Sequence, residues 1–263
     1  MSASVSASQL KKHERFRSRF LRNQRDIIVY LPPGYDEQPS RRFPVLYMHD
    51  GQNLFDRATA FGGTDWNVHG AADQLIEAGA IQPLIIVGIY NAGKSRINEY
   101  TPTKSTKLGG GRADRYAKFL LQELMPFIEG EYRVSRGPSA TGIAGSSLGG
   151  LVSLYVGLQN PRVFGKIAAL SPSVWWDQRA IFRFAERVNP EPRPRIWLDI
   201  GTREGPRIVP EVERFRDILV KKGWRLEEDL HYERVEGAEH NEAAWSARVA
   251  PFLQFLFPAS ENM

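Results

Sequence analysis

Short apolar segments rich in β-branched residues alternate along the chain with segments in which apolar residues recur at helical spacing. The strand-like segments span residues 26–31, 44–49, 84–90, 140–144, 166–170, 195–200 and 226–235. The clearest helical stripes are Tyr116, Phe119, Leu120, Leu124, Phe127 and Ile128, followed by Val212, Phe215, Ile218 and Leu219. Such alternation is typical of a mostly parallel sheet with helices on both faces. The pattern therefore predicts an α/β fold, and a 42% hydrophobic composition suits a single domain over residues 1–263.

Two connections between these segments are longer than most loops in compact domains. They span residues 52–68 and 91–111. Long loops carried by a rigid scaffold frequently bind substrates, so both are candidates for substrate-binding loops.

The charge balance and the lack of cysteine restrict the chemistry. The net charge of +5 favours an anionic substrate through long-range attraction. Basic residues are densest at 11–19, where we expect a solvated strand face, and no aromatic-basic module accompanies them, so nucleic-acid binding is not expected. Without cysteine the chain has no disulfide, no thiolate metal site and no cysteine nucleophile.

No apolar run approaches the roughly 20 residues that a membrane-spanning helix needs. Residues 1–10 lack both the early positive charge and the apolar stretch of a secretory signal. We therefore expect no membrane partner, and either a cytoplasmic location or a secretory signal that has been removed.

A candidate nucleophile lies at residues 145–149, which read Gly-Ser-Ser-Leu-Gly. This G-x-S-x-G motif directly follows the apolar residues 141–144 and precedes the helical run 151–158, the context in which the motif marks a strained strand-to-helix turn of the α/β-hydrolase fold. Small residues at both ends let the chain fold back on itself. The spacing selects Ser147 as the nucleophile and excludes Ser146.

A serine hydroxyl needs a neighbouring base, and imidazole suits that role near neutral pH. His240 lies in the loop 236–241, after the last predicted strand and before a C-terminal helix, where hydrolases of this architecture carry their base. The other four histidines lie in a charged N-terminal stretch, at a strand end, at the start of a helix and inside a strand: His13, His49, His69 and His231. His240 is therefore the predicted base.

The acid that orients the base should follow a strand end between Ser147 and His240. Glu204 fits best, because it lies in the loop after the strand 195–200. Asp199, inside that strand, and Asp177, after an earlier strand, are the alternatives.

Together these motifs resemble the esterase D-like putative esterase family of α/β-hydrolases, which includes feruloyl and acetylxylan esterases, ferric-enterobactin esterases and mycolyltransferases. The resemblance covers nearly the whole chain and rests on residues 29–35 (VYLPPGY), on 49–55 (HDGQNLF), on the serine motif, and on the loops 201–204 and 237–240. In feruloyl esterases of this family the segment corresponding to 201–204 ends in aspartate, so Glu204 is a departure. Mycolyltransferases use glutamate as their acid.

The resemblance implies that the backbone amides of Gln52 and Leu148 form the oxyanion hole. It implies no cofactor. We expect no metal either, because His240 and Glu242 do not form a ligand set and no second histidine clusters with them.

Five further side chains are candidates for substrate contacts. Trp175 and Trp176 are expected to form a pocket wall facing the nucleophile, with core packing as the alternative. Arg96, Glu99 and Tyr100 lie in the second long loop and could contact the acyl or alcohol part of a substrate, with solvated surface as the alternative.

The sequence predicts a serine esterase that acts through an acyl-enzyme on an acylated carbohydrate or a siderophore lactone. Acyl transfer to a sugar or alcohol acceptor is an alternative, since nothing in the sequence distinguishes water from alcohol as acceptor. A non-catalytic binding protein of the same fold is a second alternative, because fold does not imply activity.

Overall fold

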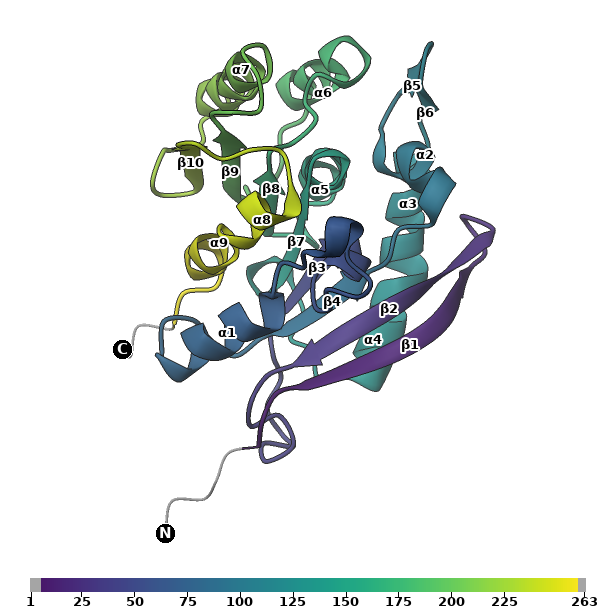
Figure 1. Ribbon diagram of the computed structural model, residues 1–263, viewed down its shortest axis with the longest axis vertical. Coiled ribbons are helices and arrows are strands. Elements are labelled where there is room, and N and C mark those ends of the chain that lie inside the picture. The colour runs from purple at the N-terminus through teal and green to yellow at the C-terminus, as the bar shows by residue number, and fades with distance from the viewer. Residues whose placement is uncertain (1–5, 260–263) are drawn as a thin grey trace.

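A mixed sheet of eight strands runs through the computed structural model, which describes residues 6–259 (Figure 1). In spatial order the strands are β1 (Gln9–Ser18), β2 (Asn23–Leu31), β4 (Ile85–Ile89), β3 (Val45–His49), β7 (Thr141–Ser146), β8 (Lys166–Leu170), β9 (Arg195–Gly201) and β10 (Leu230–Val235). The β1–β2 and β2–β4 pairings are antiparallel, and every later pairing from β4 to β10 is parallel. The predicted α/β fold with a mostly parallel sheet is confirmed.

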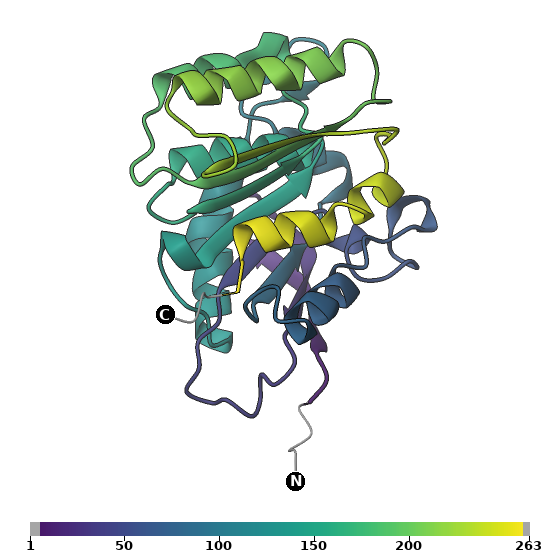
Figure 2. The same cartoon turned by 90° about the vertical axis from the view of Figure 1, so that its left-hand side faces the viewer.

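Helices cover both faces of this sheet. They are α1 (Val68–Glu77), α2 (Arg96–Tyr100), α3 (Ala113–Phe119), α4 (Met125–Glu131), α5 (Leu148–Gln159), α6 (Trp176–Arg187), α7 (Ile208–Lys221), α8 (Glu242–Ser246) and α9 (Val249–Leu256). Buried residues of α1, α8 and α9 share one hydrophobic core, and those of α3 to α7 share the other. Figure 2 shows α9 and α7 on opposite sides of the strands.

Alternation along the strands supplies apolar side chains to both cores. In β3, Val45 and Tyr47 belong to the core beneath α3 to α7, whereas Leu46 and Met48 belong to the core beneath α1 and α9. Successive side chains of a strand point to opposite faces, so a strand covered on both faces is continuously apolar. This explains why the buried strands could be recognised as short apolar runs.

The boundaries of several predicted elements differ from the structure. The last strand begins at Leu230 rather than at residue 226, because residues 225–229 form a turn in which Glu227 has a φ of 62°. The helical stripe over 116–128 is interrupted by a π-helical turn, Leu120–Leu124, between α3 and α4. The charged segment 11–19 forms most of the exposed edge strand β1.

Both long connections contain short regular elements. The first holds two 3₁₀ turns, Gly51–Asn53 and Phe61–Gly63. The second holds the 3₁₀ turn Gly93–Ser95, helix α2, and the two-stranded hairpin β5 (Lys104–Ser105) and β6 (Gly109–Gly110). No helix among residues 6–259 is long and apolar enough to cross a membrane.

The turn after β3 lies directly against the neighbouring strand β4. A Cβ atom added to Gly51 would lie 2.5 Å from the carbonyl carbon of Gly88 and 2.6 Å from the backbone nitrogen of Ile89. Backbone atoms inside a sheet cannot move aside as a flexible side chain can. Only glycine therefore allows the turn to approach β4 this closely.

We expect Gly51→Ala to lower the free energy of unfolding by about 1–3 kcal/mol, because the new methyl group would collide with β4. Gly130→Ala in α4 is the matched control, since a Cβ there meets nothing within 4 Å. Alanine in that helix should raise the free energy of unfolding by about 0.5–1 kcal/mol. Urea denaturation measures both, and equal effects of the two substitutions would contradict the close approach.

Candidate active site

The chain reverses direction at Ser147, between the end of β7 and the start of α5. Ser147 has φ 55° and ψ −120°, a backbone conformation that non-glycine residues rarely adopt. A Cβ on Gly145 would lie 2.8 Å from the carbonyl carbon of Gly149, so the two glycines let the strand and the helix meet. The sharp turn presents the Ser147 hydroxyl beyond the strand edge.

His240 lies beside this hydroxyl, in the loop between β10 and α8. Its Nε2 is 2.9 Å from Ser147 Oγ. The ring packs edge-on against Trp245, with centroids 4.8 Å apart and an interplanar angle of 82°. Asn241 begins α8 by accepting a hydrogen bond from the Ala244 amide at 3.0 Å. The cap and the indole together orient the imidazole.

Glu204 lies on the opposite side of the imidazole, in the loop after β9. Its Oε2 is 2.6 Å from His240 Nδ1, and its Oε1 accepts hydrogen bonds from the Gly201 amide at 2.8 Å and from the Ser171 hydroxyl. Burial alone would raise the pKa of Glu204, but these hydrogen bonds outweigh burial and hold the pKa below its ordinary value. The arrangement therefore favours a carboxylate that can stabilise a protonated imidazole.

The two alternative acids occupy other positions. Asp199 is fully buried and pairs with Arg248, whose Nη1 is 2.6 Å from Asp199 Oδ1. The indole N–H of Trp197 donates to Asp199 Oδ2 at 2.7 Å. Asp177 lies at the start of α6. Within the described part of the chain, Glu204 is the one carboxylate that contacts the His240 ring.

The same Arg248 connects the two buried carboxylates. It donates to the Ser171 hydroxyl at 2.9 Å and approaches Glu204 Oε1 at 3.8 Å. Burial raises the pKa of Asp199 in spite of the arginine. Asp199 thus acts structurally, by holding the arginine and serine that lie behind Glu204.

Two backbone amides are available near the Ser147 hydroxyl. Among the described residues, neither the Gln52 amide nor the Leu148 amide has a hydrogen-bond acceptor. Leu148 is the first residue of α5, where amides are free and the helix dipole favours negative charge. The Gln52 side chain accepts a hydrogen bond from the Asn91 amide at 3.2 Å, which ties the first long loop to the second.

A pocket of about 380 Å³ opens beside Ser147 and His240. Its walls carry carboxylates, amides, one arginine and two aromatic rings: Asp50, Gln52, Asn53, Phe61, Asn91, Arg96, Ser146, Ser147, His240, Glu242 and Trp245. The pocket is more polar than most small-molecule sites, which are lined mainly by apolar side chains. This composition suits a substrate rich in polar groups.

Arg96 lies in this pocket, whereas its neighbours in α2 do not. Its Nε and Nη2 each contact a different oxygen of Asp50 at 2.8 Å, so the arginine charge is largely matched. Tyr100 is fully buried behind it, with the Arg96 guanidinium 5.2 Å from its ring centroid. Glu99 is buried in an ion pair with Arg25 at 2.8 Å. Of the three candidates in this loop, the pocket includes Arg96 alone.

The two tryptophans lie outside the lining of this pocket. Trp176 is buried, and its indole N–H donates to the Thr103 carbonyl at 2.9 Å. Trp175 is 42% exposed and follows Ser173, whose Oγ is 3.3 Å from Ser147 Oγ. A substrate contact by Trp175 stays a prediction.

Sequence reasoning did not select several lining residues. Phe61 is the most conspicuous, because its ring is 78% exposed at the pocket wall. Glu242 stands two positions after His240, and Asp50 directly precedes the turn that holds Gln52. The available signals were the place of Phe61 in the predicted substrate-binding loop 52–68 and the closeness of Asp50 and Glu242 along the chain to predicted site residues.

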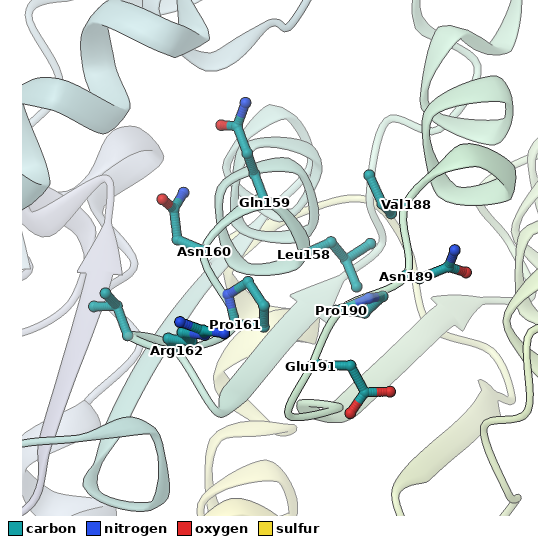
Figure 3. A pocket seen from close by; sticks show the side chains of 10 residues that line it. Leu158, Gln159, Asn160, Pro161, Arg162, Val188, Asn189, Pro190 and Glu191 are labelled. Atoms are coloured by element: carbon teal, nitrogen blue, oxygen red, sulfur yellow. The ribbon is translucent and has the colours of Figure 1, made fainter.

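A larger cavity, of about 560 Å³, lies at the other end of the sheet (Figure 3). It is lined by residues at and after the C-terminal ends of α5 and α6, among them Leu158, Pro161 and Glu191. Ser147 precedes α5, so this cavity is separated from the nucleophile by the length of that helix. Within residues 6–259 no cluster of histidine and acidic side chains could hold a metal ion.

Several known proteins resemble this chain in sequence. The uncharacterized protein YbbA of Bacillus subtilis is 27% identical over 89% of this chain and 92% of its own length. An endo-1,4-beta-xylanase/feruloyl esterase of Xylanibacter ruminicola is 27% identical over 87% of this chain and 29% of its own length. The iron(III) salmochelin esterase of Escherichia coli is 29% identical over 76% of this chain and 47% of its own length. The chain thus spans less than half of these two esterases.

The fold also matches solved structures. The BES protein of Bacillus cereus superposes with a TM-score of 0.77 over 98% of this chain and 97% of its own, at 22% identity. The sequence model of one family, described as Putative esterase, matches residues 18–256. That match covers nearly the whole chain, so the protein belongs to the Putative esterase family.

Proposed function

We propose that this protein hydrolyses carboxylic esters through an acyl-enzyme, with Ser147 as nucleophile, His240 as general base and Glu204 as the acid that orients the base. The observation that carries the proposal is the continuous chain of contacts from Ser147 Oγ through His240 to Glu204, at 2.9 Å and 2.6 Å. Ser147 and His240, the first two residues in this series of contacts, line a pocket large enough for a small ester. Membership of an esterase family supports the same reaction.

In the first half of the reaction Ser147 Oγ attacks the ester carbonyl carbon while its proton passes to His240 Nε2. The Glu204 carboxylate stabilises the imidazolium that forms. The tetrahedral intermediate then collapses, the bond to the alcohol oxygen breaks, and His240 donates its proton to the departing alcohol. Water repeats the sequence on the acyl-enzyme, and the acid is released.

The negative oxygen of the intermediate would lie between the Gln52 and Leu148 amides. Both N–H groups are without acceptors in the described part of the chain. Fixed backbone donors stabilise developing charge without reorganising, and the loss of one such donor typically costs about 3–4 kcal/mol in barrier height. Gly51, which brings the turn against β4, is therefore important for the position of the Gln52 amide.

The names of the relatives and the composition of the pocket together support a proposed substrate class. Two related proteins are named as a feruloyl esterase and a salmochelin esterase. A carbohydrate ester presents hydroxyl groups beside the ester bond. The amide side chains of Gln52, Asn53 and Asn91 can hydrogen-bond to such groups. An acylated carbohydrate or a siderophore lactone is thus the proposed substrate.

We expect Ser147→Ala and His240→Ala each to lower kcat for p-nitrophenyl acetate by more than about 10³-fold, because either change removes a participant in acyl transfer. The control is Ser246→Ala, since Ser246 lies in α8 and donates to the Trp66 carbonyl outside the pocket lining. Thermal unfolding of each variant separates lost catalysis from lost folding. Turnover near the wild-type rate by folded Ser147→Ala would contradict the mechanism.

The acid can be tested separately. Glu204→Gln should lower kcat by about 10³–10⁴-fold, because a neutral amide cannot stabilise the imidazolium. Asp177→Asn should change kcat less than about twofold. Asp199→Asn should mainly lower the free energy of unfolding, since it removes the closer of the two carboxylates that neutralise the buried Arg248. A Glu204→Gln enzyme that remains active while folded Asp199→Asn is inactive would assign the role to Asp199.

A further inference from the structure

Glu242 is a pocket carboxylate that the proposed mechanism does not use. It is the first residue of α8, two positions after His240, and it lines the pocket beside Ser147. Among the described residues one other side chain donates a hydrogen bond to it, from Asn53 Nδ2 to Oε1 at 3.1 Å. Carboxylates accept several hydrogen bonds when ionised, so Glu242 retains capacity for a ligand.

The charge of Glu242 is not matched by a protein cation. No lysine, arginine or histidine among residues 6–259 forms an ion pair with it. Arg96 is the nearest candidate in the pocket, but its two contacts at 2.8 Å go to Asp50. Because Arg96 and Asp50 offset each other, the carboxylate of Glu242 gives the pocket an excess of negative charge. The local charge is thus opposite in sign to the net charge of +5.

Two aromatic rings share the pocket with Glu242. Phe61 is 78% exposed, and Trp245 forms the wall behind His240. A cation is attracted to the face of an aromatic ring and to a carboxylate, and the combination recognises ammonium groups in many proteins. An anionic group would instead be repelled by Glu242, since the charges of Asp50 and Arg96 largely offset each other.

We propose that Glu242 is a specificity residue that binds a cationic group of the substrate, an ammonium or a quaternary ammonium, beside the ester bond. The inference rests on the proposed ester hydrolysis and narrows its substrate: among acylated carbohydrates and siderophore lactones, it selects those that carry a cationic nitrogen. It reverses the expectation, based on net charge alone, that an anionic substrate is favoured. Phe61 supplies the apolar contact for the carbon atoms that surround the positive nitrogen.

The preference for a cationic substrate should depend on pH, because protonation removes the charge of Glu242. Burial raises the pKa of Glu242, and the negative charge of Asp50 adds to the rise. The other charged or titratable groups that face Glu242 are His240 and Arg96, and both act in the opposite direction. Because the pKa of Glu242 is raised, the carboxylate loses its charge at a higher pH than an ordinary glutamate does. The preference for a cation should therefore fall as the pH is lowered toward this raised pKa.

Matched ester pairs test the proposal. One pair varies the alcohol: acetylcholine and the neutral ester in which carbon replaces the quaternary nitrogen. The other pair varies the acyl group: the p-nitrophenyl ester of γ-trimethylammoniobutyrate and its neutral carbon isostere. We expect wild type to favour the cationic member in at least one pair, and Glu242→Gln to reduce the cation-to-neutral ratio of kcat/KM by about tenfold.

Glu239→Gln is the matched control, because Glu239 is an exposed glutamate of the same loop whose side chain contacts Asn241. It should leave the ratio unchanged within about twofold. The ratio is then followed as a function of pH. Both members of a pair share the same catalytic groups, so a ratio that rises with pH in wild type and is flat in Glu242→Gln reports Glu242.

The outcomes separate this inference from the proposed function. Ser147-dependent hydrolysis of p-nitrophenyl acetate, with no cation preference or with the same ratio in wild type and Glu242→Gln, overturns the role of Glu242 and leaves the esterase intact. Absence of Ser147-dependent hydrolysis overturns the proposed function itself. A tenfold lower cation-to-neutral ratio in Glu242→Gln, with no such change in Glu239→Gln, supports both the role of Glu242 and the proposed function.

Discussion

The reversal of the chain at Ser147 is the constraint on which the site depends. A φ of 55° at a non-glycine residue is costly, and it persists because Gly145 and Gly149 let β7 and α5 pack against each other at the turn. The same turn fixes the position of the Ser147 hydroxyl. It leaves the Leu148 amide without an acceptor among the described residues and directs the N-terminus of α5 toward that hydroxyl. One strained residue thereby determines the position of both the Ser147 hydroxyl and the Leu148 amide, the proposed nucleophile and one proposed oxyanion donor.

The second half of the site depends on a buried ionic arrangement rather than on strain. Asp199 and Arg248 form a buried pair, and the arginine holds the Ser171 hydroxyl, which in turn donates to Glu204. An ion pair this deeply buried contributes little net stability, but the removal of one partner is severe. The role of this ion pair is to hold the Glu204 carboxylate in position, on the side of His240 opposite Ser147.

The sequence contained enough information to recognise the fold and the chain order of the candidate site. The strand 166–170 could be bounded correctly because it is apolar on both faces. The start of β10 was predicted too early, because Leu226 resembles a strand residue although the acidic residues 227–229 that follow it form a turn. Gly-x-Ser-x-Gly marks a local conformation and could therefore be read directly. Phe61 and Glu242 reach the pocket through tertiary packing, which spacing along the chain does not encode.

The central claim is that Ser147 attacks an acyl carbon whose oxygen is received by two backbone amides. A crystal structure of the enzyme inactivated by a fluorophosphonate tests this most directly, because the adduct mimics the tetrahedral intermediate. The account predicts phosphorus bonded to Ser147 Oγ, with the phosphoryl oxygen about 2.7–3.1 Å from the backbone nitrogens of Gln52 and Leu148. An adduct on another residue, or a phosphoryl oxygen directed away from both amides, would contradict it.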